Sequence, residues 1–155
     1  MTLREDLKYF LKTGRLKNVE FGITRSQLID KCGNTEWLHY TFAKSKYPSI
    51  YKYGRFEFYF DEGSKGTLIG IMFQPIPMPA ENGNMFFNYN RLNYNTSINK
   101  LKDYLKSINI NFKELDDEFD KELKLIITEG DVTMFLDCQN SNQYLLHKAG
   151  RFIER

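Results

Sequence analysis

The feature that most constrains this chain is an internal similarity between two segments that lie 76 residues apart. Shifted by that distance, residues 54–61 (GRFEFYFD) fall on residues 130–137 (GDVTMFLD), and both segments begin with glycine and end with aspartate. The same shift places a helical pattern at residues 28–32 on another at residues 104–108. Because a period this long lies outside the range of solenoid repeats, it predicts two copies of one unit that contains helix and sheet.

The apolar periodicities predict the elements of each unit. Thr2 and Thr24 begin capping boxes, Thr96 or Ser97 can cap a third helix, and Gly14 and Gly33 end the first two. Apolar stripes then predict helices that begin at these caps and reach residues 13, 32 and 108. Alternating patterns predict strands in both halves, over residues 50–53, 55–60, 68–73, 123–128, 132–137 and 144–148.

Helices that alternate with runs of antiparallel strands indicate the α+β class. We therefore expect two tandem helix-plus-antiparallel-sheet units, with the helices packed on one face of the sheet. The prolines at 75, 77 and 79 and the Asn-Gly-Asn at 82–84 mark a boundary. The expected organisation is a first unit at 1–75, a linker or edge segment at 76–95 and a second unit at 96–155, within one compact domain.

Aromatic residues are the most informative part of the composition. The chain has 155 residues, of which ten are tyrosine and thirteen phenylalanine, more rings than one modest core normally holds. Tyrosine suits interfaces because it brings a large area and a polar tip with few rotatable bonds. Tyr51, Tyr53 and Tyr59 are therefore candidate partner-binding residues, although a core or edge-strand role suits them equally.

An acidic run offers a second candidate contact surface, formed by Asp116, Asp117, Glu118 and Asp120. The run lacks the central glycine and the residue order of an EF-hand, so we expect no metal there. It is either a solvated hairpin tip or an acidic surface that steers a basic partner.

No reactive centre is evident in the sequence. The cysteines, Cys32 and Cys138, fit no metal or redox spacing, and the chain has only two histidines, His39 and His147. Glycine-rich phosphate motifs are absent. We therefore expect no catalytic residue, no metal and no cofactor.

Nucleic acid and membrane partners are not favoured. The net charge of +2 argues neither for nor against a nucleic-acid protein. Rings beside basic residues at 51–56 and 87–91 could bind single-stranded RNA, but they match no RNP signature, and burial of one strand face explains the alternation. No apolar run approaches the length of a membrane span, and the acidic start is unlike a signal peptide, so we expect a soluble, cytoplasmic protein.

Residues 21–33 (FGITRSQLIDKCG) and 51–60 (YKYGRFEFYF), followed by an apolar return strand, resemble the short unit of the β-lactamase-inhibitor-protein and BamE-like group. The resemblance covers residues 19–73, and it reaches the second half through the internal similarity. It implies a small antiparallel sheet whose surface holds another protein. Small bacterial immunity proteins are similar in size, aromatic richness and lack of catalytic residues.

The resemblance and the composition together predict a non-enzymatic protein-binding module. The most concrete form is an immunity or inhibitor protein that binds and neutralises a cognate bacterial toxin or enzyme. No lipid-anchoring cysteine stands near the start, which favours a cytoplasmic binder over an outer-membrane role. An RNA-binding or regulatory domain is the alternative, and an enzyme of unrecognised type is a third interpretation.

Overall fold

A computed structural model describes residues 3–35, 37–62, 66–76, 85–138 and 142–153. Within these residues the chain forms three helices, α1 (Leu7–Thr13), α2 (Arg25–Cys32) and α3 (Ile98–Ser107). It also forms ten strands, which are β1 (Leu3–Asp6), β2 (Leu38–His39), β3 (Ile50–Tyr53), β4 (Phe56–Phe60), β5 (Leu68–Phe73), β6 (Met85–Asn88), β7 (Phe112–Asp116), β8 (Leu123–Thr128), β9 (Thr133–Asp137) and β10 (Leu145–Phe152).

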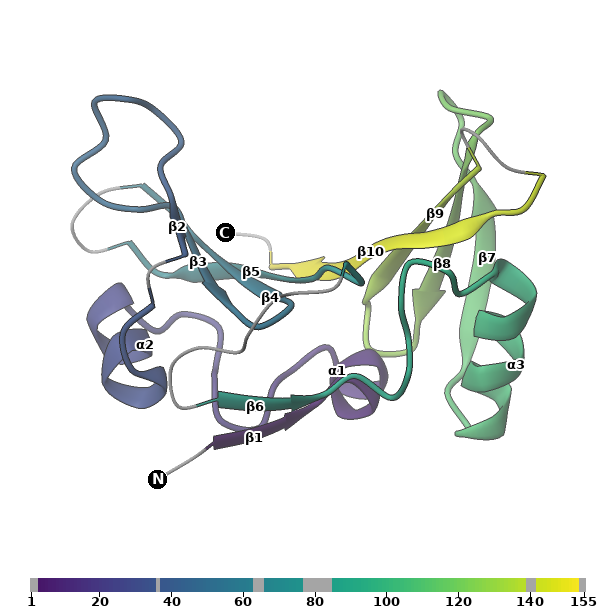
Figure 1. Ribbon diagram of the computed structural model, residues 1–155, viewed down its shortest axis with the longest axis horizontal. Helices are drawn as coiled ribbons and strands as arrows, with labels where there is room; N and C mark the ends of the chain where they lie inside the picture. Colours follow the sequence, from purple (N-terminus) through teal and green to yellow (C-terminus); the bar gives the residue numbers. More distant parts are fainter. Residues whose placement is uncertain (1–2, 36, 63–65, 77–84, 139–141, 154–155) are drawn as a thin grey trace.

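One antiparallel sheet of eight strands dominates the fold (Figure 1), in the order β2-β3-β4-β5-β10-β9-β8-β7. The two central strands, β5 and β10, come from different halves of the chain, and Phe73 lies opposite Ala149. These two residues are 76 positions apart, which is the shift that relates the two segments of the sequence. Counted inward from the two edges, the strands therefore correspond in pairs. β2, β3, β4 and β5 of the first half match β7, β8, β9 and β10 of the second.

The predicted α+β class is wrong, because the described chain is mainly β. Its longest helix, α3, has ten residues, and at about 1.5 Å per residue it is about 15 Å long. Eight strands about 4.8 Å apart span roughly 34 Å. Helices this short do not form a continuous layer over the sheet, and the two halves share one sheet in place of two separate helix-covered units.

The first predicted helix begins later than expected. Leu3–Asp6 forms β1, which pairs in parallel with β6 in a small second sheet. The N-cap of α1 is Asp6, whose carboxylate accepts a hydrogen bond from the backbone of Lys8. The proposed cap Thr2 lies outside the described residues, and the strand pairing with β6 explains why the helix does not start beside it. Gly14 ends α1 in the left-handed region, with φ 67, as predicted.

The caps of the other two helices are confirmed. Thr24 and Gln27 form the predicted capping box of α2, and the Ser97 side chain accepts a hydrogen bond from Lys100 N in α3. Each capping residue also makes an isolated β-bridge to a residue later in the same half of the chain. Thr24 pairs with Thr67, and Ser97 pairs with Leu145. The helices α2 and α3 therefore join the sheet at corresponding places, beside the starts of β5 and β10.

Residues 34–48, which the sequence left unassigned, contain the two-residue edge strand β2 and part of the loop that follows it. In the predicted linker 76–95, β6 is a strand, and residues 77–84 lie outside the described residues. No helix among the described residues is long and apolar enough to cross a membrane.

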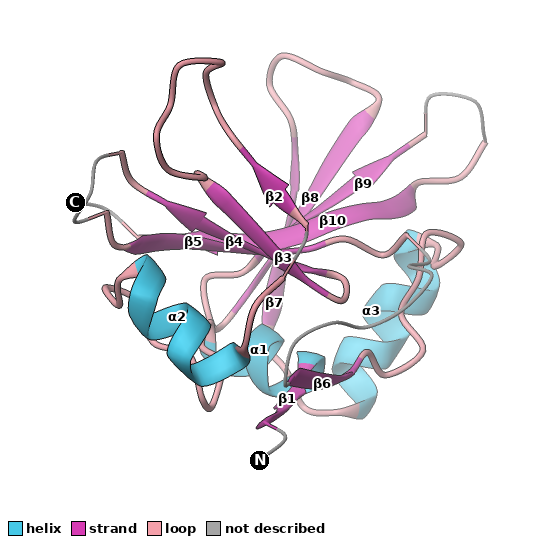
Figure 2. Cartoon of the chain, turned by 60° about the vertical axis from the view of Figure 1, so that its left-hand side comes forward, coloured by secondary structure: helices cyan, strands magenta, loops and turns pink. Residues whose placement is uncertain are grey.

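The core lies between the eight-stranded sheet and the helices. Buried residues of all three helices share one cluster with the alternate residues of β3, β4, β8 and β9. Figure 2 shows the helices and the small sheet on one side of the eight-stranded sheet, while its other side carries no helix. We call that uncovered side the open face.

Candidate functional site

The strand registers identify the side chains of the open face. In β4 the buried residues are Phe56, Phe58 and Phe60, so Glu57 and Tyr59 point to the opposite side. Residues directly opposite one another in neighbouring strands share a face. Following the registers from Glu57 and Tyr59, and from the buried Met134 and Leu136 that flank Phe135, gives the residues of the open face. These are Ile50, Lys52, Glu57, Tyr59, Gly70, Met72, Lys113, Leu115, Leu123, Leu125, Ile127, Thr133, Phe135, Asp137, Leu145, Lys148, Gly150 and Phe152.

The part of the open face over β7–β10 is largely apolar. Phe135 and Leu125 lie opposite each other and are half-buried, and Leu115 continues the row onto the edge strand. Phe152 is 50% exposed and contacts Tyr59 edge-to-face, with ring centroids 5.1 Å apart. The Nζ of Lys148 lies 5.0 Å from the centre of the Phe135 ring. Rings and aliphatic side chains therefore stay partly in water on this surface.

The part of the open face over β3–β5 carries a polar network instead. The Glu57 carboxylate accepts hydrogen bonds from Lys52 Nζ at 3.2 Å, from Tyr59 Oη at 2.6 Å and from Gln74 Nε2 at 3.3 Å. Burial raises the pKa of the Tyr59 hydroxyl, and the hydrogen bond to Glu57 raises it further. A hollow of about 370 Å³ lies beside this network, and Trp37, His39 and Ile50 are among the residues that line it.

Two loops flank the open face. Figure 1 shows the β2–β3 loop and the β7–β8 hairpin rising from opposite ends of the sheet, on the side away from the helices. The β2–β3 loop, residues 40–49, exposes three rings and two lysines, which are Tyr40, Phe42, Lys44, Lys46 and Tyr47. The β7–β8 hairpin carries the acidic run, and Phe119 at its tip is 97% exposed.

The four predicted acidic residues lie at that hairpin, and two of them shape its turn. Asp117 Oδ1 accepts hydrogen bonds from the backbone of Phe119 and Asp120, each at 2.9 Å. Asp120 Oδ1 accepts one from the backbone of Glu122. Asp116 lies 3.6 Å from Lys124 Nζ, and Glu118 is exposed. The hairpin is therefore a built turn that also presents negative charge.

The three predicted tyrosines do not share a face. Tyr51 is 6% exposed and Tyr53 is fully buried, where its hydroxyl donates to the Gly33 carbonyl at 2.6 Å. Both rings belong to the core, and of the three only Tyr59 lies on the open face. Other tyrosines do reach the surface, as the aromatic content predicted, and these are Tyr9, Tyr40, Tyr47 and Tyr94.

The sequence reasoning missed the residues of β8–β10 that make the apolar half of the open face. The signal was present in the alternation of Leu123, Leu125 and Ile127 with buried Ile126. The face on which Phe152 lies depends on the register of β10 against β5. It also depends on an irregularity in the β10–β9 pairing between Leu146 and Lys148. Neither can be read from the chain alone.

The described residues offer little support for catalysis or for metal binding. They contain no group of three or more His, Cys, Asp or Glu side chains that could hold a metal ion. Cys32 is fully buried, and burial raises the pKa of its thiol to about 12. The thiol is therefore protonated near neutral pH and is a poor nucleophile.

The two segments considered for RNA come together, but their rings pack against the core. Phe87 is 3% exposed and stacks on Phe56 with centroids 4.8 Å apart. Tyr89 stacks on Phe87 and on Phe73, with centroids 5.8 Å and 5.7 Å apart. These faces are occupied by other rings, so they do not form a stacking platform for bases.

Comparison with protein-family models, with curated proteins and with solved structures finds no match to this chain.

Proposed function

We propose that this chain is a non-enzymatic protein-binding module that holds its partner against the open face. The most concrete form is a cytoplasmic immunity or inhibitor protein that neutralises a toxin or enzyme. The observation that carries the proposal is the apolar surface of β7–β10, left uncovered between two projecting loops. The sequence resemblance to the β-lactamase-inhibitor-protein group supports the same function.

The chemistry of the open face suits a protein partner. Rings, methionine and aliphatic side chains are the groups that dominate the buried centres of protein interfaces. Here they stand on hydrogen-bonded strands, so little conformational entropy is lost when a partner covers them. The exposed rings of the β2–β3 loop and Phe119 extend the same kind of contact to both ends of the face.

The polar groups of the face support binding better than catalysis. The Glu57 carboxylate already accepts three hydrogen bonds, and the raised pKa of Tyr59 keeps its proton on the hydroxyl. Both cysteines are free thiols, which suits the reducing cytoplasm.

The test is affinity capture from the native cell with this chain as bait. Phe152→Glu and Leu115→Glu each place a charge on the open face and should abolish capture of the partner. Tyr9→Glu is the matched control, because Tyr9 is 37% exposed on α1, away from the open face. It should retain the partner.

Loss of capture in Tyr9→Glu alone, or capture that survives both open-face variants, would contradict the proposal. Circular dichroism of the three variants separates loss of binding from loss of folding.

A further inference from the structure

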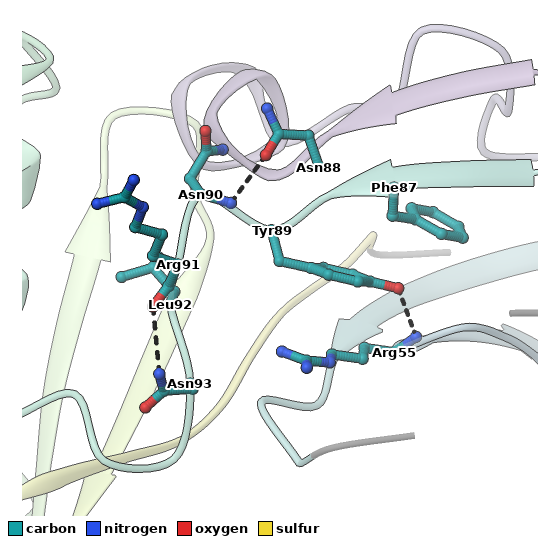
Figure 3. A pocket seen from close by; sticks show the side chains of 8 residues that line it. All are labelled: Arg55, Phe87, Asn88, Tyr89, Asn90, Arg91, Leu92 and Asn93. Atoms are coloured by element: carbon teal, nitrogen blue, oxygen red, sulfur yellow. Dashed lines mark hydrogen bonds between the residues drawn. The ribbon is translucent and has the colours of Figure 1, made fainter. Parts of the chain in front are cut away.

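A second feature lies where the β3–β4 turn meets the segment after β6 (Figure 3). A hollow of about 440 Å³ there is lined by Arg55 and residues 87–93. That volume falls within the range of about 300–1,000 Å³ typical of small-ligand sites. The strand face that carries the proposed protein contact does not line it.

Arg55 is held in place by one ring. Its backbone N–H donates to the Tyr89 hydroxyl at 2.9 Å, and its guanidinium carbon lies 4.7 Å from the centre of the Tyr89 ring. Tyr89 is in turn stacked against Phe73 and Phe87. The guanidinium is thus oriented before any ligand arrives, which lowers the entropy cost of binding.

The loop opposite Arg55 is fixed by its asparagines. Asn88 Oδ1 accepts a hydrogen bond from Asn90 N at 3.0 Å, and Asn93 Nδ2 donates to the Arg91 carbonyl at 3.3 Å. Asn90 and Arg91 both have positive φ, 52 and 63. An arginine in the left-handed region is strained, and such strain gathers at functional sites.

Of the described residues that line the hollow, one presents a positive group to it. Figure 3 shows the Arg55 guanidinium lying beneath the Tyr89 ring and reaching toward Leu92 and Asn93, while the Arg91 guanidinium points away. The described lining residues include no Asp or Glu, and the nearest carboxylate that contacts them, that of Asp6, is engaged by Asn90 Nδ2 at 2.8 Å. Among the described residues, no carboxylate lies within 4.0 Å of Arg55 or Arg91.

We propose that this hollow binds a carboxylate, held by the guanidinium fork of Arg55. The fork matches a planar carboxylate through two parallel hydrogen bonds. A phosphate dianion should bind more weakly, because the Arg55 guanidinium faces the hollow while the Arg91 guanidinium points away from it. The carboxylate belongs either to a small organic acid or to an acidic side chain of the protein partner, and this second source rests on the proposed function.

The test follows the Nε–Hε signals of the arginines by NMR on the wild-type protein. Glutarate at constant ionic strength should give a saturable shift of the Arg55 signal. Glutaramide, its neutral counterpart, should give none, and inorganic phosphate should bind about tenfold more weakly because it lacks the planar match. A shift that does not saturate, or a tighter response to phosphate or to single-stranded RNA, would overturn the proposal.

Two variants sharpen the result. Arg55→Lys keeps the charge but loses the fork, so glutarate affinity should fall about tenfold. Arg91→Lys is the matched control and should leave it unchanged; an equal loss there would overturn the assignment to Arg55. If Arg55→Lys also weakens capture of the protein partner, the carboxylate is the partner's. If capture is unchanged while glutarate affinity falls, the source is a small acid.

The titration needs no protein partner. A saturable glutarate shift can therefore stand even if the open-face variants fail to affect capture.

Discussion

The two halves of the eight-stranded sheet have the same strand order, yet they place most of their rings on opposite faces. In β3 and β4 every ring except that of Tyr59 points into the core, whereas the core residues of β8 and β9 are aliphatic or methionine. In β9 and β10 the two phenylalanines, Phe135 and Phe152, lie on the open face instead. The comparison teaches that one strand arrangement can serve as a packed anchor in its first half and as a contact surface in its second.

The largest expected difference between the halves concerns their cores. Phe56 and Met134 are both fully buried, and they are the neighbours of the central residues Phe73 and Ala149. Phe56→Ala removes a ring that contacts four others and should cost about 4 kcal/mol of unfolding free energy. Met134→Ala should cost about 3 kcal/mol. Urea denaturation measures both, and a larger cost at Met134 would contradict an aromatic anchor in the first half.

The next difference concerns the first residue of α2 and of α3. Arg25 is buried, and its guanidinium donates to the carbonyls of Pro48 and Asp61 at 2.8 Å and 2.7 Å. Arg25→Ala leaves both carbonyls without these donors and should cost about 2–3 kcal/mol. Ile98 holds the corresponding place in α3, and Ile98→Ala should cost about 1 kcal/mol because the side chain is half-buried.

Equal losses at Arg25 and Ile98 would show that the two helix starts are interchangeable. Proteolysis of the β2–β3 loop, which ends close to Pro48, gives a second measure, and it should accelerate only in Arg25→Ala.

Alkaline pH should weaken the first half more than the second, because the pKa is raised for three tyrosines of β3 and β4, Tyr51, Tyr53 and Tyr59, but for only two in the described part of the second half, Tyr104 and Tyr144. Burial raises the pKa of Tyr53 above its ordinary value. The folded state therefore keeps a proton that the unfolded chain releases above about pH 10. Stability is full below that pH and falls above it, by at most about 1.4 kcal/mol per pH unit for each such tyrosine.

Tyr53→Phe should reduce this slope in urea titrations between pH 9 and pH 11. Tyr94→Phe is the matched control for removal of a tyrosine hydroxyl, since Tyr94 is exposed. An unaltered slope in Tyr53→Phe would show that the alkaline loss arises elsewhere.

The smallest effect is expected at the hairpin tip. Asp116, Asp117 and Asp120 changed together to Asn keep their oxygen acceptors, so the turn stays formed while the charge is lost. Association with the captured partner should slow by about threefold to tenfold and lose much of its salt dependence. Unchanged kinetics would remove the acidic run from the binding surface. Lys44→Gln with Lys46→Gln is the matched change in the opposite loop.

The sequence predicted local structure well and its packing poorly. The caps at Thr24 and Ser97 and the strands around residues 50–60 and 123–137 were foreseen, because capping and alternation are local signals. The strand Leu3–Asp6 was read as helix, since its pairing with Met85–Asn88 involves residues more than 80 positions away. The α+β class failed for a related reason, because no local signal shows that β5 and β10 join the halves into one sheet.

The candidate site was predicted only in part. The acidic hairpin and Tyr59 lie on or beside the open face, while Tyr51 and Tyr53 belong to the core. Period-two alternation separates two sides of a strand without saying which one is covered. That choice depends on where α2 and α3 pack, and for Phe152 it also depends on the β10 register.

The central claim, that the open face is the contact surface, is tested most directly by side-chain footprinting of the isolated complex with hydroxyl radicals. The account predicts that Phe152, Leu115 and Phe119 lose reactivity when the partner is bound, while Tyr9 on α1 keeps it. Protection of Tyr9 and the helices with full reactivity at Phe152 would contradict it.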